Sequence, residues 1–178
     1  MLCINNTYTN VYFNLASEEY LLKNLSDNIF MLWQNEPSVI VGKYQDVFAE
    51  VDVSLAQEQN IKIARRFSGG GAVFHDSGNL NLTFIENNSN VNFDSFTNRI
   101  IDLLSRIGIH AESDLRRAIN IDGLKISGSA QCIHKDRVMY HATLLFSSDL
   151  GNLVRILNGD PKSMKNQTDK RIYVKSVK

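Results

Sequence analysis

Three consecutive glycines, Gly69 to Gly71, lie between two short segments that we predict to be strands, Ile61 to Arg65 and Ala72 to His75. Because glycine has no Cβ, this stretch of backbone can adopt positive φ and approach a ligand closely. Successive N–H groups in such a loop can form a nest that binds an anion. The run therefore predicts a connecting loop whose main chain is open to a ligand.

The residues around this run decide between a ligand site and an ordinary turn. Arg65 and Arg66 precede it, and His75 and Asp76 end the segment. Guanidinium groups are planar donors suited to phosphate or carboxylate. A simple turn flanked by two solvent-facing arginines is the alternative. The arginine pair, the apolar strand and the His-Asp end together favour a nucleotide site.

Two common nucleotide signatures are excluded at these glycines. A Rossmann fingerprint that starts at Gly69 requires glycine at position 74, which is Phe74. A phosphate-binding loop that ends at Gly42-Lys43 requires glycine at position 37 and Ser or Thr at position 44, which are Pro37 and Tyr44. The sequence therefore does not indicate a dinucleotide-dependent dehydrogenase or a Walker-type ATPase.

Helical and extended segments are mixed along the chain. Apolar spacing and capping residues predict helices at residues 13–25, 52–59 and 92–107. In the first of these, Glu18, Glu19 and Lys23 are expected away from the apolar face, which consists of Phe13, Leu15, Ala16, Tyr20, Leu21 and Leu22. Further strands are expected at Ile29–Trp33, Ser38–Val41, Leu80–Ile85, Ile119–Ile121, Leu124–Ile126 and Val138–Phe146. This mixture predicts an α+β fold with a mixed, largely antiparallel β-sheet flanked by helices.

A hairpin is expected directly after the glycine run. The segments Ala72–His75 and Leu80–Ile85 have strand character, and Asp76-Ser77-Gly78-Asn79 between them has the composition of a tight turn. We therefore predict that these two strands pair with each other.

A second glycine-containing segment, Asp122 to Gln131, places Lys125 between Leu124 and Ile126 and continues with small residues. A lysine in a strand commonly points to solvent, and this segment alone favours that interpretation. If Lys125 faces inward, its ammonium group can bridge a carboxylate and a phosphate.

Composition sets wider limits. The 178 residues suit one domain, with 43% hydrophobic and 21% charged residues. A net charge of zero argues against nucleic-acid binding. The sequence contains no signal peptide or membrane span, and it has only Cys3 and Cys132, so a reducing, cytoplasmic location without membrane contact is expected. The basic residues within 161–178 are interpreted as a solvated terminus, with an acidic partner as the alternative.

Five blocks in this order resemble the lipoate–protein ligase A family, within the biotin and lipoate protein ligase superfamily. They are Asn14–Glu19, Pro37–Gly42 with Gln45 nearby, Arg65–Phe84, Asp122–Gln131 and His141–Leu145. The resemblance implies a single catalytic domain over residues 1–178 that forms lipoyl-AMP from lipoate and Mg-ATP. It also implies transfer of the lipoyl group to a lysine of a lipoyl domain of a 2-oxoacid dehydrogenase E2 subunit or of the glycine-cleavage H protein.

The resemblance also implies roles for individual residues. Lys125 is the expected catalytic residue and contacts both lipoate and the α-phosphate. The nucleotide is expected to bind Lys125 together with Arg66, Gly71, Ala72, Val73 and Phe74. Lipoate is expected to bind Lys125 together with Gly70, His75, Asn79 and His141, the last three of which could equally have a structural role. The protein itself is expected to hold no metal, since Mg²⁺ enters with ATP.

The chain departs from the family pattern at two places. The stretch Leu115-Arg116-Arg117-Ala118 replaces a usual Gly-Arg-Asn-Asp, and Tyr140-His141-Ala142-Thr143 replaces a usual His-His-Gly-Thr. The family's C-terminal accessory domain is expected to be absent, so that the chain is a truncated form or works with a separate accessory domain. Two alternatives remain open: a lipoyl or octanoyl transferase that uses a preformed donor, and a non-catalytic lipoate- or adenylate-binding domain. A cysteine-dependent transferase is disfavoured because residues 100–124 and 133–178 contain no cysteine.

Overall fold

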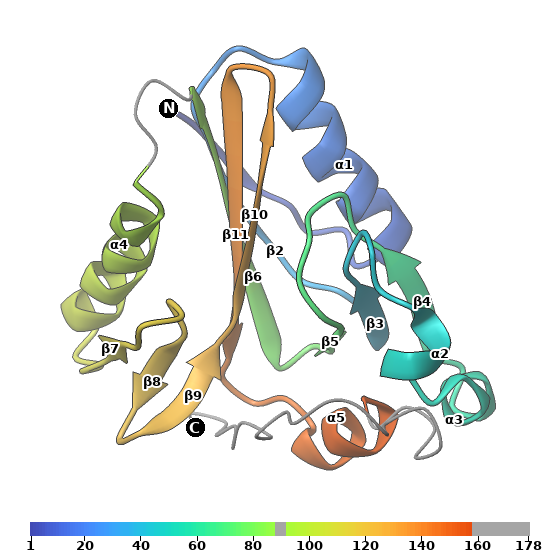
Figure 1. Ribbon diagram of the computed structural model, residues 1–178. Coiled ribbons are helices and arrows are strands. Elements are labelled where there is room, and N and C mark those ends of the chain that lie inside the picture. The colour runs from blue at the N-terminus through green and yellow to red at the C-terminus, as the bar shows by residue number, and fades with distance from the viewer. Residues whose placement is uncertain (88–91, 158–178) are drawn as a thin grey trace.

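A five-stranded sheet forms the centre of the protein (Figure 1). The computed structural model describes residues 1–87 and 92–157. The strand order is β1 (Leu2–Asn5), β2 (Ile29–Trp33), β6 (Asn79–Asn87), β11 (Arg137–Leu145) and β10 (Ser129–His134). The pair β1 and β2 is parallel, and the other three pairs in this sheet are antiparallel.

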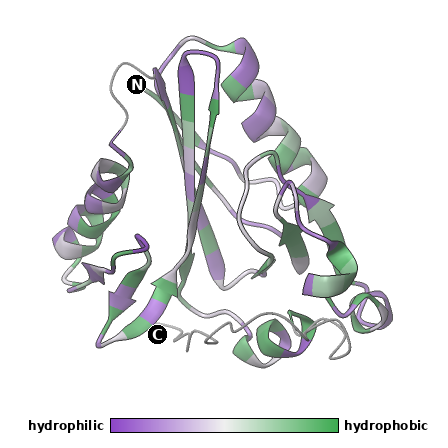
Figure 2. Cartoon of the chain, in the orientation of Figure 1, coloured by the Kyte–Doolittle hydropathy of each residue, from purple (hydrophilic) through white to green (hydrophobic). Residues whose placement is uncertain are grey.

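Helices cover both faces of this sheet (Figure 1). The helix α4 (Phe93–Arg106) packs Phe96, Ile100 and Leu104 against a cluster that includes Phe84 and Tyr140. On the opposite face, α1 (Val11–Asn24) contributes to a separate cluster through Leu22. Apolar and polar residues alternate along the strands and around α4, as the colouring in Figure 2 shows. The helix α4 therefore buries its apolar side and leaves the other side polar.

Two smaller sheets complete the described fold. One has the order β4 (Lys62–Arg65), β3 (Ser38–Val41), β5 (Val73–His75), with β3 parallel to β4 and antiparallel to β5. It shares a core with the short helices α2 (Val47–Glu50), α3 (Val53–Glu58) and α5 (Leu150–Ile156). The other consists of β7 (Glu112–Ser113), β8 (Ile119–Ile121) and β9 (Leu124–Ser127). The predicted α+β fold with mixed, largely antiparallel sheets is confirmed.

The helix α1 is present and Leu22 is buried as expected, but the predicted burial is wrong at Phe13, Tyr20 and Glu18. Glu18 is only 2% exposed, whereas Phe13 is 49% and Tyr20 is 61% exposed. The buried residues of α1 are Val11, Asn14, Glu18 and Leu22, at helical spacing. The reason is that α1 covers a polar part of the central sheet, where Thr83 donates a hydrogen bond to Glu18 at 2.5 Å.

The predicted hairpin after the glycine run is also wrong. Both strands exist, but β5 pairs with β3, and β6 pairs with β2 and β11. Both edges of β6 are therefore occupied by other strands, and β5 lies in a different sheet. In the connecting turn, the Asp76 side chain accepts hydrogen bonds from the backbone N–H groups of Gly78 and Asp149. The turn thus transfers the chain from one sheet to the other.

Several other predicted helices and strands are present, and some observed elements were not predicted. The helices at residues 52–59 and 92–107 and the strands at Ile29–Trp33, Ser38–Val41 and Ile119–Ile121 are confirmed within one or two residues. The elements β1, β7, β10, α2 and α5 were not predicted. No helix in residues 1–87 and 92–157 is long and apolar enough to cross a membrane. The basic residues within 161–178 lie outside the described residues.

Candidate active site

A cavity of about 500 Å³ lies between the central sheet and the β4–β3–β5 sheet. Trp33, Asn81 and Thr143 occupy one row of the central sheet, because Asn81 pairs with both of the others. Ile40 and Val73 pair with each other on the opposing sheet and line the same cavity. These two sheets therefore supply two of its walls.

The cavity has an open and a closed end. Gly70, Gly71, Asp114 and Arg116 line it and are exposed residues. In contrast, Trp33, His75 and Asn81, which also line it, are 2–4% exposed. Solvent therefore reaches the glycine loop but not the end that contains Trp33.

Strand alternation decides which of the predicted site residues reach this cavity. Eight of them line it: Arg66, Gly70, Gly71, Ala72, Val73, His75, Lys125 and His141. Along β5, Val73 and His75 face the cavity, whereas Phe74 points away into the core shared with α3 and α5. Asn79 is fully buried outside the lining, and its Nδ2 donates to Oδ1 of the lining residue Asn81 at 3.0 Å. The structure thus brings most of the predicted set together and places Phe74 and Asn79 behind it.

The glycine loop folds tightly against the turn after β3. A Cβ on Gly42 would lie 1.7 Å from the carbonyl oxygen of Gly70, so only glycine fits at position 42. Of the three consecutive glycines, Gly70 alone has positive φ, at 90°. The expected conformational freedom is therefore required at one position of the run rather than at all three.

The buried side chain of Arg66 stabilises this loop through hydrogen bonds to its backbone. Its guanidinium donates to the carbonyl oxygens of Gly69 at 2.6 Å, Gly71 at 2.8 Å and Ile40 at 3.0 Å, and to Ser68 Oγ at 3.1 Å. Burial lowers the pKa of Arg66 to about 10, opposed by the nearby Glu18 and Glu50 carboxylates, so it stays cationic at neutral pH. The loop therefore carries a fixed positive charge held by its own carbonyl groups.

Arg65 and Glu50 complete the loop's polar contacts. Arg65 donates to the carbonyl oxygens of Gly42 and Gln45, both at 2.8 Å, and so braces the neighbouring turn. Glu50, at the end of α2, accepts a hydrogen bond from the backbone N–H of Ala72 at 3.2 Å and lines the cavity. A carboxylate of the protein itself thus accepts a hydrogen bond from Ala72, one of the residues predicted to bind a nucleotide.

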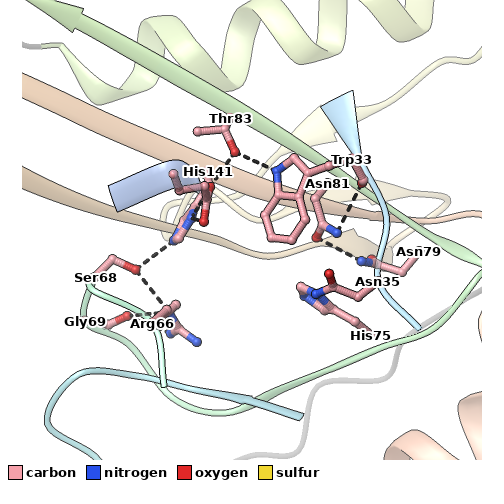
Figure 3. A network of polar contacts seen from close by, with 11 residues as sticks. Trp33, Asn35, Arg66, Ser68, Gly69, His75, Asn79, Asn81, Thr83 and His141 are labelled. Atoms are coloured by element: carbon pink, nitrogen blue, oxygen red, sulfur yellow. Dashed lines mark hydrogen bonds and ion pairs between the residues drawn. The ribbon is translucent and has the colours of Figure 1, made fainter. Parts of the chain in front are cut away.

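A continuous hydrogen-bond chain connects the central sheet to Arg66 (Figure 3). Trp33 Nε1 donates to Thr83 Oγ1 at 2.8 Å, which leaves the Thr83 hydroxyl to donate to Glu18. Glu18 accepts from His141 Nδ1 at 3.0 Å, and His141 Nε2 lies 2.7 Å from Ser68 Oγ. The Ser68 oxygen also accepts from Arg66 Nε at 3.1 Å, so Ser68 links His141 to Arg66.

This chain resembles a Ser-His-Glu nucleophilic arrangement, but Ser68 is fully buried and is not part of the cavity lining. A substrate therefore cannot reach the Ser68 hydroxyl from the cavity. The geometry instead fixes the glycine loop and Arg66 relative to the central sheet.

A second chain ends at His75. Asn14 Nδ2 lies 2.9 Å from Asn35 Oδ1, and Asn35 Nδ2 lies 3.0 Å from His75 Nδ1. Burial, with a smaller effect from the Arg66 and His141 charges, lowers the pKa of His75 to about 3. His75 is therefore a neutral imidazole at physiological pH.

Lys125 lies on β9 and lines the cavity, so the surface-lysine interpretation is wrong. Burial lowers its pKa, Asp114 raises it and Arg116 lowers it. No carboxylate in residues 1–87 and 92–157 forms an ion pair with Lys125 within 4.0 Å. A Cβ on Gly128 would lie 3.7 Å from the Nζ of Lys125, so the glycine leaves space beside that ammonium group. Its ammonium group is thus available to an anionic ligand in the cavity.

Several residues of the cavity, and Glu18 in the hydrogen-bond network beside it, were not identified from sequence. Glu50 and Asp114 carry no motif that distinguishes them from surface acids. Glu18 lies within the block Asn14–Glu19 that carries the family resemblance, and that block was the available signal. Trp33 was predicted only as a strand residue.

Comparison with known proteins identifies the family. The lipoyl protein ligase A/B catalytic domain family matches residues 10–178. The chain belongs to this family. Lipoate–protein ligase 1 of Staphylococcus aureus is 42% identical over 173 residues, which cover 94% of this chain and 53% of that protein. The chain spans about half the length of the curated lipoate–protein ligases that it matches.

Solved structures share the catalytic-domain fold. The LipL1 protein of P. falciparum, in complex with lipoate, is 32% identical with a TM-score of 0.82, over 93% of this chain and 54% of that one. A bi-partite lipoate protein ligase from Thermoplasma acidophilum, described together with its E2 lipoyl domain, is 26% identical with a TM-score of 0.85, over 99% of this chain and 74% of that one. The fold of this chain is therefore that of lipoate–protein ligase catalytic domains.

Proposed function

We propose that this chain is the catalytic domain of an ATP-dependent lipoate–protein ligase. The observation that carries the proposal is the cavity between the two sheets. Its open end has the glycine loop and Lys125, and its closed end is lined by buried side chains. This arrangement suits a substrate with an anionic head at the open end and a tail that the closed end shields from water, such as lipoate. The lipoate-bound relative, at 32% identity, supports this choice of acid.

The proposed reaction has two steps. A carboxylate oxygen of lipoate attacks the α-phosphorus of ATP, the bond between the α- and β-phosphates breaks, and pyrophosphate leaves. The amine of an acceptor lysine then attacks the acyl carbon, the bond from that carbon to the phosphate oxygen breaks, and AMP leaves as the amine loses a proton. Two anions must approach each other in the first step, so fixed positive charge is the main requirement.

The residues of the open end match this requirement. Lys125 has a free ammonium group in the cavity, where it can contact the carboxylate and the α-phosphate together. The backbone N–H groups of Gly71 to Phe74 are the proposed nucleotide ligands, and Arg66 supplies charge behind them. Gly70, His75, Asn79 and His141 are proposed on the lipoate side, with Asn79 acting only through Asn81.

Mg²⁺ is proposed to enter as part of the ATP substrate. In residues 1–87 and 92–157 no group of three or more His, Cys, Asp or Glu side chains could hold a metal ion. Asp114 is an exposed carboxylate that lines the cavity, whereas Glu50 is engaged by the N–H of Ala72. One or two carboxylates together with substrate phosphates suit Mg²⁺ bound to a nucleotide.

The acceptor is proposed to be a lipoyl domain of an E2 subunit, or the H protein, in the cytoplasm. The Thermoplasma ligase, described as bi-partite and together with its E2 lipoyl domain, supports both this class of acceptor and a separate accessory chain as partner. A cysteine-dependent transferase is disfavoured because burial, with the Glu18 and Glu19 charges, raises the pKa of Cys132 to about 11. A thiol in that state is a weak nucleophile.

The test combines the full chain with lipoate, Mg-ATP and an apo lipoyl domain, with and without an accessory domain. Pyrophosphate release and a mass increase of the acceptor are expected, and both should require ATP. Modification only from supplied lipoyl-AMP or an acyl-carrier donor would indicate a transferase instead. Neither product under any condition would indicate a binding domain.

A further inference from the structure

The orientation of the His75 ring is determined by its hydrogen-bond partners. Asn14 Nδ2 lies 2.9 Å and 3.0 Å from the backbone carbonyl oxygens of Tyr8 and Gln34, which can only accept. Because that nitrogen is a donor and shares its two hydrogens among three acceptors, an NH₂ group of Asn35 cannot face it, and the facing atom is the amide oxygen. Asn35 therefore presents its NH₂ group to His75.

His75 Nδ1 must accept this hydrogen bond. A neutral imidazole with an unprotonated Nδ1 carries its hydrogen on Nε2. The Nε2 atom is buried and has no hydrogen-bond partner among the described residues. His75 is 4% exposed and lines the cavity. The protein thus holds a buried, unsatisfied N–H donor on a ring that belongs to the cavity lining.

The position of this donor points to one part of the substrate. Three residue steps separate His75 from Ala72, which corresponds to roughly 10 Å along an extended chain. That distance is comparable to the length of an extended eight-carbon acyl chain. Trp33 packs edge-on against the His75 ring, with the centroids 6.1 Å apart, and both belong to the closed end. An acid whose carboxylate lies near the glycine loop and Lys125 therefore places its tail beside His75.

Taking lipoate activation as the function, we infer that His75 Nε2–H donates to a sulfur of the dithiolane ring and selects it over an unsubstituted hydrocarbon tail. Sulfur is a weak acceptor. A hydrocarbon tail offers none, so it leaves the buried N–H unsatisfied. Sites built to hydrogen-bond a substrate group discriminate strongly against analogues that lack the group. His75 is in this view a specificity residue.

The deciding comparison uses two acids of the same shape. One is lipoate, and the other is its carbocyclic analogue, in which cyclopentane replaces the dithiolane ring. Wild-type protein should bind lipoate roughly 10-fold more tightly by calorimetry, and pyrophosphate release with Mg-ATP should show the same ratio. In His75→Phe the ratio should fall to about one. In Ile40→Val, a matched wall variant without a polar change, it should stay near the wild-type value.

Nitrogen NMR of the wild-type protein tests the tautomer without any substitution, so a variant that fails to fold does not remove the test. Nε2 should be the protonated nitrogen, and its proton should shift on addition of lipoate but not of the carbocyclic analogue. Equal binding of the two acids, or a proton on Nδ1, would overturn the inference and leave the ligase proposal standing. Binding of neither acid, with no pyrophosphate released, would overturn both.

Discussion

Replacing Glu50 with glutamine should strengthen ATP binding. In the structure, Glu50 Oε2 accepts a hydrogen bond from the backbone N–H of Ala72 at 3.2 Å, inside the cavity. This N–H is among the groups proposed to bind phosphate, so the carboxylate and the nucleotide compete for one donor. Glutamine keeps the side chain's length and its accepting oxygen but removes the negative charge.

The size of the effect follows from the two kinds of hydrogen bond. A hydrogen bond to a charged group contributes about 1.5–3 kcal/mol, and a neutral one about 0.5–1.5 kcal/mol. Displacing glutamine should therefore cost about 1 kcal/mol less than displacing Glu50. Repulsion between the displaced carboxylate and the nucleotide acts in the same direction, and it is reduced by salt. We expect the Kd for ATP to fall roughly 5- to 10-fold.

The assay is calorimetric titration of ATP into both proteins at low and high salt. Glu86→Gln is the matched control, because it removes the same charge from a carboxylate that pairs with Arg99 and does not line the cavity. That variant should bind ATP as the wild type does. Unchanged or weaker ATP binding in Glu50→Gln would refute competition for the Ala72 N–H and would indicate instead that Glu50 assists the bound nucleotide, for example through Mg²⁺.

Three further predictions concern Lys125, Phe74 and His75. Lys125→Ala should lower lipoyl-AMP formation by roughly 100-fold or more with an unchanged circular dichroism spectrum, and near-normal turnover would contradict its role. Phe74→Ala should lower the free energy of unfolding by about 3–5 kcal/mol in urea titrations, because Phe74 is 3% exposed in the core and not in the cavity. Because the pKa of His75 is lowered to about 3, its unfolded form takes up a proton first as pH falls from about 6.5. Between pH 6.5 and 5 this group should therefore remove roughly 2 kcal/mol of stability, a loss that His75→Phe should not show.

Much of the fold follows from local sequence patterns. The helix at residues 92–107 has apolar residues at strict helical spacing and an asparagine N-cap, whose side chain accepts from the N–H of Asp94. The strand at Ile29–Trp33 is a continuous apolar run. In both elements the local pattern and the tertiary environment agree, and the predicted bounds are within two residues of the observed ones.

Pairing between strands could not be predicted in the same way. The turn Asp76–Asn79 has the composition of a hairpin, but β5 finds its partner in β3, and β6 is sandwiched between β2 and β11. Turn composition reports only that the chain changes direction. Which sheet each strand joins depends on contacts with residues more than thirty positions away in sequence, which local patterns do not contain.

The candidate site shows the same division between local and distant information. The glycine loop was identified from a short distinctive segment, whereas the segment of Lys125 alone favoured a solvent-facing lysine, and its role came from the family resemblance. Glu18 was placed on the exposed face of α1, since a carboxylate is rarely buried without partners. Its partners, Thr83 and His141, lie on two strands far along the chain. The prediction failed because it treated α1 as a helix that packs only apolar residues.

The burial of Glu18 has a consequence for how the site is held together. A buried carboxylate is costly unless its hydrogen bonds are satisfied. Glu18 is satisfied by Thr83 and His141, and His141 also contacts Ser68, whose oxygen accepts from Arg66. These contacts run without a break from the Glu18 carboxylate to the Arg66 guanidinium. A shift of the glycine loop would break the contact at Ser68 and leave buried polar groups unpaired. The polar face of the central sheet therefore holds the glycine loop in one position before any ligand arrives, and a site that must bring two anions together depends on such prior organisation.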